Sequence, residues 1–269
     1  MADTRWRLRE KYGDWALVTG ASAGIGLEFA RAIAREGVAV VLTARREDRL
    51  NALAREFRDS YHVDTRVVAC DLAAADGADR LADAVADLPI GILVNNAGFG
   101  YAGRFDKLAT ERLRSMVRVN CEVPVVLTSR ILPAMVLRRR GAVIVVGSVA
   151  GRQPLPLHAV YSATKSFDLI FGEALWGELR GTGIDAIVIE PGATQTEFQQ
   201  VAGEMVGPNH GEPAENVVRV TFDSLGKQPS VVSGWFNWLR ANTIRLMPRA
   251  TAVKIARKVV EGQTPAALR

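Results

Sequence analysis

The chain has 269 residues and a mass of 29.1 kDa, with 48% hydrophobic and 23% charged residues, which is typical of a globular protein and excludes a disordered one. Its 34 basic and 29 acidic residues give a net charge of +5. The one dense basic run, 138–140, is typical of a helix end next to Gly141, so we expect no nucleic-acid partner.

The two cysteines, Cys70 and Cys121, form no CxxC pair, so we expect neither disulfides nor a metal site. A reducing cytoplasm is the location that fits this cysteine usage. The charged stretch 1–14 has no apolar core typical of a signal peptide. No run of about 18 apolar residues occurs, and we therefore expect no integral membrane segment.

Short apolar, β-branched runs predict six strands buried on both faces of a parallel sheet. These runs are 16–19, 38–43, 66–70, 90–94, 142–146 and 186–189. Segments with helical periodicity lie between them, at 25–36, 47–58, 77–87, 110–138 and 161–180. The alternation predicts a doubly wound α/β sheet in three layers, one domain over 1–269, with ligands at the carboxyl ends of the strands.

After Gly192 the composition changes. The stretch 193–213 is polar and interrupted by glycine and proline, then come the strand-like pair 231–232 and a tryptophan-bearing segment, 234–247. We interpret 193–250 as a variable flap over the substrate site of the same domain.

A glycine-rich turn joins the first strand to the first helix, with the sequence Thr19-Gly20-Ala21-Ser22-Ala23-Gly24-Ile25-Gly26. Glycines allow a positive φ and a close backbone approach, and the amides at a helix start favour a pyrophosphate. The alternative is an ordinary tight turn, because the spacing is GxxxGxG and not GxGxxG.

The second strand ends in Leu42-Thr43-Ala44-Arg45-Arg46, where an NAD site usually has an acid for the ribose. Two guanidinium groups there favour a 2′-phosphate, and hence NADP(H) rather than NAD(H). The alternative is that Arg45 and Arg46 belong to a solvated, charged helix start, since Glu47 and Asp48 follow directly.

In Tyr161-Ser162-Ala163-Thr164-Lys165, the tyrosine and the lysine lie on one face of a helix. A neighbouring ammonium lowers the pKa of a phenol and makes it a usable acid and base at neutral pH. Ser148 follows the strand 143–147 and should point into the same crevice. The alternatives are an exposed helix pair and an ordinary serine at a strand end.

Together these motifs, with Asn95-Asn96-Ala97-Gly98, Asn120 and Pro191-Gly192, resemble the short-chain dehydrogenase/reductase family over 15–196. The opening 12–20 is similar to the branch of 3-oxoacyl-CoA reductases and 17β-hydroxysteroid dehydrogenases. The eukaryotic members of that branch carry an amino-terminal membrane segment, which this sequence lacks. The resemblance implies a Rossmann fold and a nicotinamide cofactor.

It also implies roles for single residues. Tyr161 would be the proton donor in reduction, Lys165 would hold the nicotinamide ribose, and Ser148 would orient the substrate oxygen. Asn120 would hold a water that links Lys165 to solvent; its alternative is a buried helix asparagine. Further cofactor contacts are implied for Asp71 and Leu72 at the adenine, for Asn96, Ala97 and Gly98 at the adenosine, and for Pro191, Gly192, Thr194 and Thr196 near the nicotinamide and phosphates. Asp71 has an alternative as a helix cap.

We therefore predict an NADP(H)-dependent carbonyl reductase or alcohol dehydrogenase without a metal. The alternative is a NADP-binding regulator without turnover. Around the nicotinamide we expect Gln153, Leu155, Leu157 and His158, with Trp235, Phe236, Trp238 and Leu239 closing the pocket or, alternatively, packing in the core or against a subunit. Since 201–211 holds only Glu204 as a charged residue besides His210, we expect a neutral, hydrophobic substrate.

The helices predicted at 110–138 and 161–180 are apolar on more than one side. The surplus apolar residues are Val125, Val126, Leu127, Leu169, Ile170, Phe171, Leu175 and Trp176. In the family these helices pair across a two-fold axis, so the resemblance implies a homodimer or homotetramer. The alternative is that the flap covers them.

Overall fold

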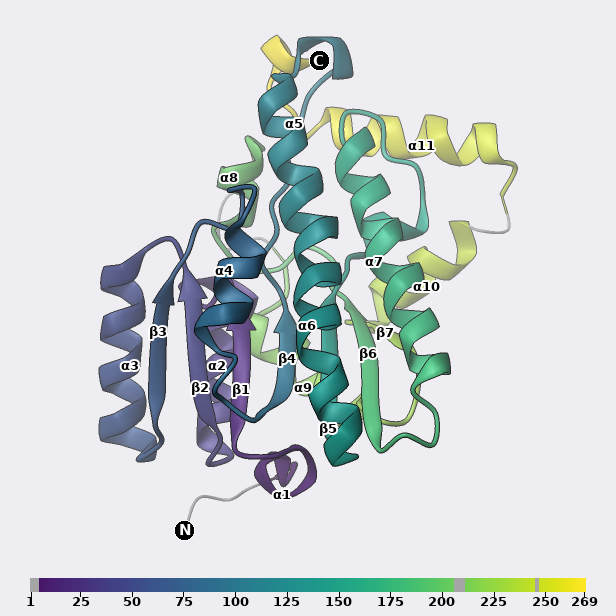
Figure 1. The fold of residues 1–269 in the computed structure, drawn as a ribbon. Coiled ribbons are helices and arrows are strands. Elements are labelled where there is room, and N and C mark those ends of the chain that lie inside the picture. Colours follow the sequence, from purple (N-terminus) through teal and green to yellow (C-terminus); the bar gives the residue numbers. More distant parts are fainter. Residues whose placement is uncertain (1–4, 206–210, 245–246) are drawn as a thin grey trace.

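The computed structural model describes residues 5–205, 211–244 and 247–269. Seven parallel strands form one sheet in the order β3-β2-β1-β4-β5-β6-β7, which confirms the predicted doubly wound sheet (Figure 1). The strands are β1 (Trp15–Thr19), β2 (Ala39–Ala44), β3 (Thr65–Ala69), β4 (Ile90–Asn95), β5 (Gly141–Val146), β6 (Ile184–Glu190) and β7 (Ser230–Val232). The order reverses between β1 and β4, which opens a crevice at their carboxyl ends.

Helices connect the strands on both faces of the sheet. They are α1 (Leu8–Tyr12), α2 (Gly24–Arg35), α3 (Glu47–Tyr61), α4 (Gly77–Ala84), α5 (Thr110–Val117), α6 (Val123–Arg138), α7 (Ala159–Glu178), α8 (Phe198–Ala202), α9 (Ala214–Ser224), α10 (Trp235–Thr243) and α11 (Arg249–Glu261). Each parallel pair of strands needs such a crossover, and right-handed crossovers in both directions produce three layers.

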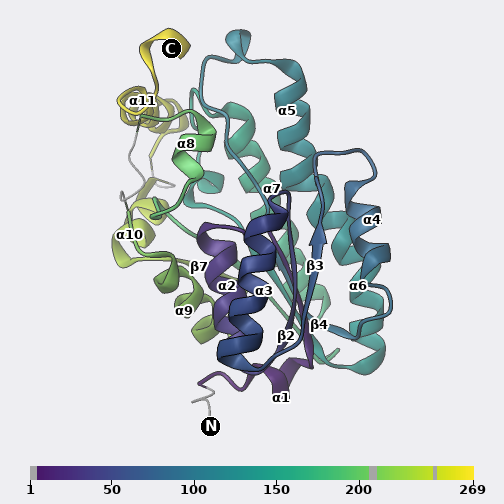
Figure 2. The same ribbon diagram turned by 90° about the vertical axis from the view of Figure 1, so that its left-hand side faces the viewer.

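Two apolar cores hold these layers together. Because successive side chains of a strand point to opposite faces, Ala16 and Val18 of β1 join one core and Leu17 joins the other. The first core packs against α2, α3 and α9, and the second against α4, α6 and α7. In Figure 2, the sheet separates α2 and α3 from α4 and α6.

The segment predicted as one helix at 110–138 is continuous but not uniform. A π-helical turn, Arg118–Glu122, lies between α5 and α6 and contains Asn120. Thr110–Arg138 is long and apolar enough to cross a membrane by length and composition alone, as core helices of globular proteins often are. Its side chains Leu127 and Met135 are fully buried in the second core, against the sheet.

The apolar surplus on α6 and α7 is smaller than predicted. Leu127 lies in the core, whereas Val126, Leu169, Leu175 and Trp176 are partly buried against it. Phe171 is partly buried and stacks on Phe167. Val125 (37%) and Ile170 (66%) are exposed, so only part of the predicted set remains available to a partner.

The predicted flap is mostly helical, and its residues 206–210, including His210, and 245–246 lie outside the described residues. The core alternative for the aromatic segment is wrong: Trp235, Phe236, Trp238 and Leu239 are between 42% and 76% exposed. On α10 it is Ala241 that is buried. Figure 1 shows α11 near the carboxyl ends of the strands, and α10 packs against β7.

Candidate active site

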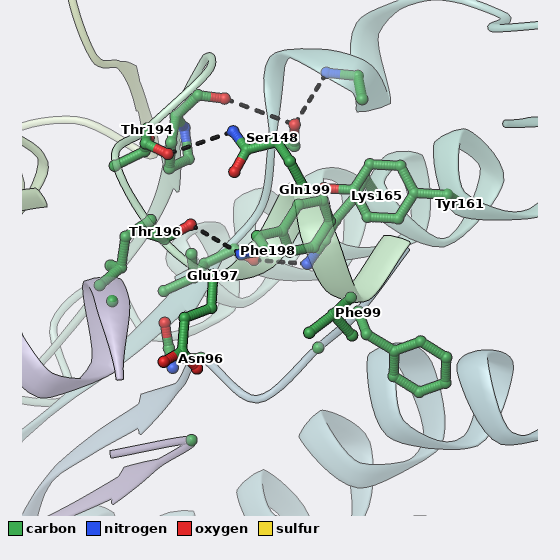
Figure 3. A pocket seen from close by; sticks show the side chains of 18 of the residues that line it. Asn96, Phe99, Ser148, Tyr161, Lys165, Thr194, Thr196, Glu197, Phe198 and Gln199 are labelled. Carbon is green, nitrogen blue, oxygen red and sulfur yellow. Dashed lines mark hydrogen bonds between the residues drawn. The ribbon is translucent and has the colours of Figure 1, made fainter. Parts of the chain in front are cut away.

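A cavity of about 620 Å³ runs along the carboxyl edge of the sheet. This volume is in the usual range for small-molecule sites. Its wall is built by the ends of β2, β4, β5 and β6, by the glycine-rich turn after β1, and by α8 and α10. Figure 3 shows Ser148, Tyr161 and Lys165 in this cavity, together with Asn96, Thr196 and Glu197.

The glycine-rich turn has the backbone that the sequence predicted. Gly20 (φ +70°) and Gly24 (φ +57°) adopt positive φ angles, and a Cβ on Gly24 would lie 2.8 Å from the methyl carbon of Thr196. Gly26 does not line the cavity. A Cβ there would lie 2.4 Å from the carbonyl oxygen of Gly20, so this glycine lets α2 pack closely on the turn.

Thr19 and Asn96 fasten β1 to β4 below the turn. The Thr19 hydroxyl accepts hydrogen bonds from the backbone amides of Asn96 and Ala97, each at 2.9 Å. The Asn96 side chain donates to the carbonyl of Thr19 at 2.7 Å. Asn95 instead points into the core and donates to Thr128, while Ala97 and Gly98 line the cavity as predicted.

Arg45 and Arg46 both line the cavity at the start of α3. The Arg46 guanidinium donates to the Ser22 hydroxyl at 3.1 Å and forms an ion pair with Glu197 at 2.7 Å. Arg49 reaches the other oxygen of Glu197 at 2.8 Å, and the hydrogen bonds from Arg49 and Arg46 lower the pKa of this carboxyl. Arg45 and Arg46 are exposed at the start of a helix, as the alternative predicted, and they also face the cavity, as a site for a 2′-phosphate requires.

Asp71 and Leu72 lie on the wall beyond β3. The Asp71 side chain accepts a hydrogen bond from the amide of Ala73 at 3.0 Å, so it stabilises a local turn, which is close to its alternative role as a cap. Its position on the cavity wall leaves it available to a ligand as well.

Tyr161 of α7 faces Ser148, which follows β5. Burial raises the pKa of the Tyr161 phenol above its ordinary value, and the opposing action of Lys165 and of the hydrogen bond with Ser148 only reduces this rise. The strand ends at Val146, as the apolar run 142–146 predicted, and Ser148 follows it after Gly147. The Ser148 hydroxyl also accepts from the amide of Ala150 at 3.1 Å and thereby caps a short 3-10 turn.

Lys165 lies one turn after Tyr161 on the same helix and is 5% exposed. Its ammonium donates to the carbonyl of Val146 at 2.8 Å and to the carboxylate of Asp168 at 2.9 Å. The predicted Tyr–Lys constellation is therefore formed, with a carboxylate that the sequence analysis did not include.

Asn120 is buried on the π-helical turn and does not line the cavity. Its side chain accepts from the amide of Phe99 and donates to the carbonyl of Phe99 and to the hydroxyl of Thr164. These bonds tie the π-helical turn to the loop after β4 and to α7, and the water held by Asn120 stays a prediction.

The loop after β6 closes the opposite wall with Pro191, Gly192, Thr194 and Thr196. The carbonyl of Pro191 accepts hydrogen bonds from the amide of Val149 at 3.1 Å and from the hydroxyl of Ser148 at 3.4 Å, which fixes the loop to the segment after β5. All four residues of the loop thus line the cavity, as predicted.

The substrate end of the cavity differs in part from the prediction. Leu155 and His158 line it, but Leu157 does not, and Gln153 lines a separate hollow. Burial lowers the pKa of His158 to about 4 and raises that of Glu204, whose carboxylate lies 3.4 Å away. Of the aromatic segment, Phe236 is the residue that reaches the wall.

Sequence reasoning missed several residues of the site. Phe198 of α8 lies with its ring centroid 5.4 Å from that of Tyr161. Outside the main cavity, Arg152 lines the separate hollow and forms a largely buried ion pair with Glu190, at 2.6 Å. Asp168 follows Lys165 by three residues, and this helical spacing could have revealed it.

The glycine-rich turn, the cavity and the Tyr–Lys pair together define an oxidoreductase that uses a dinucleotide cofactor. The family model for short chain dehydrogenase matches residues 14–207. The chain is 31% identical to the very-long-chain 3-oxoacyl-CoA reductase of Macaca fascicularis, over 92% of this chain and 83% of that protein.

Solved structures agree. A 7beta-hydroxysteroid dehydrogenase superposes with a TM-score of 0.86 and 32% identity, covering 93% of this chain and 98% of that one. A short-chain dehydrogenase from Sphingobium yanoikuyae in complex with NADPH gives a TM-score of 0.78 and 30% identity, covering 87% and 94%. This chain belongs to the short-chain dehydrogenase family. It is an oxidoreductase that transfers hydride between a nicotinamide cofactor and a carbonyl or CH–OH group.

Proposed function

We propose that the protein is an NADP(H)-dependent reductase of apolar ketones or aldehydes, and a dehydrogenase of the matching secondary alcohols. The observation that carries this proposal is one continuous cavity with Arg45 and Arg46 at one end and Tyr161 at the other. The alternative of a regulator without turnover is not favoured, because Ser148, Tyr161 and Lys165 are all in place.

The residues present fit a nicotinamide dinucleotide phosphate. The open backbone at Gly20 and Gly24 and the start of α2 suit a pyrophosphate. The guanidinium of Arg46 suits a 2′-phosphate, since it already pairs with a carboxylate on the cavity wall. The NADPH complex of the Sphingobium yanoikuyae relative supports this choice of cofactor.

Bound nicotinamide would supply or accept the hydride. The protein would handle the proton: in reduction, the Tyr161 hydroxyl donates to the substrate oxygen, and in oxidation the phenolate accepts it. The Ser148 hydroxyl would hold that oxygen by a second hydrogen bond, and the ammonium of Lys165 would stabilise the phenolate.

The substrate end of the cavity supports an apolar substrate. Its wall holds Leu155, Phe198, Val201, Phe236 and Val259. Polar side chains line the same end of the cavity too: His158, Gln199, Glu204, Asn237, Arg240 and Gln263. Two of the relatives named above are a very-long-chain 3-oxoacyl-CoA reductase and a 7beta-hydroxysteroid dehydrogenase. The acyl chain and the steroid in these names are apolar carbon skeletons, which supports an apolar substrate for this protein.

We further propose a homodimer or homotetramer in the cytoplasm. Exposed apolar side chains on α6 and α7 support assembly, among them Leu137 (86%) and Ile170 (66%). The absence of a CxxC pair in the sequence supports a reducing compartment.

Consumption of NADPH, followed by its near-ultraviolet absorbance, tests the function on a panel of carbonyl compounds. We expect the catalytic efficiency on medium-chain and cyclic apolar ketones to exceed that on glyceraldehyde and acetoacetate, because the wall offers apolar contacts to the former. Equal efficiencies would contradict the apolar substrate, and no turnover with any compound would favour the regulator.

A further inference from the structure

Lys165 and Asp168 form a buried ion pair inside α7. They lie one helical turn apart, so both side chains point to the same face. The Lys165 nitrogen and an oxygen of Asp168 are 2.9 Å apart, and the two residues are 5% and 1% exposed. The pair therefore lies in the low-dielectric interior, where charges interact strongly.

The surroundings of Asp168 show what its charge acts on. Lys165 is the cation that faces it, Tyr161 is on the same helix, and Cys121 faces it from the π-helical turn. From β5 comes the carbonyl of Val146, which shares the ammonium of Lys165. The second carboxylate oxygen of Asp168 is buried and has no hydrogen-bond partner among the described residues.

A carboxylate in this place costs stability. A buried charge loses its hydration, and a buried ion pair is often no more stable than apolar side chains of the same volume. An orphaned carboxylate oxygen adds a further desolvation cost. Packing alone thus does not explain an aspartate at this position. The effect of the Asp168 charge on Lys165 and Tyr161 does explain it.

Burial and neighbouring charges act in opposite directions on the pKa values of Lys165 and Tyr161. Burial lowers the pKa of Lys165, but the carboxylate of Asp168 and the phenol of Tyr161 raise it and prevail. At Tyr161, burial raises the pKa, Lys165 and the hydrogen bond with Ser148 lower it, and Asp168 and, after it, Glu204 raise it. The ring of His158 also lies beside that of Tyr161, with the ring centroids 6.2 Å apart. Asp168 therefore holds the ammonium in place and weakens the action of its charge on the phenol.

We propose that Asp168 is a positioning residue of the hydride-transfer reaction: it fixes the Lys165 ammonium at the floor of the site and offsets part of its charge at the Tyr161 phenol. This inference rests on the proposed role of Tyr161 as proton donor and acceptor.

The test is the pH dependence of alcohol oxidation by the Asp168→Asn variant with saturating NADP⁺. Asparagine keeps the shape and an oxygen acceptor for Lys165 but removes the negative charge. The phenolate then meets an uncompensated ammonium, so the pH at which the rate reaches half of its plateau should fall by about one unit. In the reduction direction, the loss of rate at high pH should move to lower pH in the same way.

Glu173→Gln is the matched control. It removes one carboxylate from the same helix, but Glu173 binds Ser230, and we expect its pH profile to match the wild type. The proposal is overturned if the profile of Asp168→Asn does not move, moves to higher pH, or moves no further than that of Glu173→Gln. Should the asparagine variant fail to fold, Asp168→Ser takes its place with the same expected direction.

A second measurement needs no turnover, so it separates this inference from the proposed function. Burial, and after it Asp168, raises the pKa of the Cys121 thiol to about 11. Alkylation of Cys121, followed by mass spectrometry of its peptide apart from that of buried Cys70, should reach half of its maximal rate at lower pH in Asp168→Asn. An unchanged midpoint would overturn the charge offset even if Tyr161 proves to be the acid.

Discussion

At the scale of single residues, the site depends on one proton. The Tyr161 hydroxyl is the group on the cavity wall that faces both Ser148 and Lys165. Tyr161→Phe removes that proton and keeps the ring, so we expect a loss of turnover of about 100-fold or more with cofactor affinity retained. Steady-state rates and fluorescence titration with NADPH measure the two quantities.

Tyr101→Phe is the control for this prediction. Tyr101 does not line the cavity, and its ring packs under the guanidinium of Arg112 instead. Activity of Tyr161→Phe near that of the Tyr101→Phe control would contradict the mechanism.

The site residues were predictable where their type is rare and their spacing strict. Tyr161 and Lys165 were found because a helix puts i and i+4 on one face, and Gly20 and Gly24 because positive φ excludes most side chains. Asp168 was missed because a carboxylate on a helix is usually a solvated one. Its burial follows from the packing of α7 on β5, which the periodicity of one segment does not contain.

At the scale of elements, an ion-pair cluster joins the start of α3 to the start of α8. Glu197, which precedes α8, holds both Arg46 and Arg49, but of these two arginines only Arg46 lines the cavity. The carboxylate thus occupies the guanidinium that a 2′-phosphate would bind. Binding of NADP(H) would exchange one anion for another at the base of the flap.

Replacement of both Arg45 and Arg46 by alanine should therefore weaken NADPH binding by roughly 10- to 100-fold, the usual range for charge-assisted hydrogen bonds. NADH has no 2′-phosphate, and its affinity should hardly change. Calorimetric titration of both cofactors measures this selectivity.

Arg49→Ala serves as the matched variant, because it also breaks an ion pair with Glu197 but removes no cavity residue. We expect it to leave the ratio of NADPH to NADH affinity intact. A wild-type protein that binds NADH as tightly as NADPH would contradict the cofactor preference.

The strands and helices were largely predictable, and the details at their ends were not. The six apolar runs are strands because a parallel sheet covered on both faces needs β-branched residues in series. The π-helical turn at Arg118–Glu122 leaves no mark in the apolar periodicity on either side. The place of Gln153 outside the main cavity depends on how the turn after Ser148 packs, which is tertiary information.

At the scale of the whole molecule, the exposed apolar side chains of α6 and α7 predict self-association. Light scattering at micromolar concentration should give two or four times the chain mass of 29.1 kDa. Ile170→Glu places a charge in this surface and should lower the mass toward that of one chain.

Trp238→Glu provides the comparison, since Trp238 is similarly exposed (56%) but lies on α10. Its mass should equal that of the wild type. A wild-type mass near 29.1 kDa would contradict the prediction of an oligomer. Dissociation by Trp238→Glu but not by Ile170→Glu would show that the interface lies on α10.

The strand order also bears on how the chain acquires its activity during synthesis. β1 to β4 occupy four adjacent places in the sheet, so the first 95 residues contain a complete set of mutually paired strands before β5 exists. The glycine-rich turn and Arg46 belong to this first half, whereas Ser148, Tyr161 and Lys165 belong to the second. A nascent chain can therefore pair the strands that carry its phosphate-binding edge long before the residues of its proton donor have been synthesised.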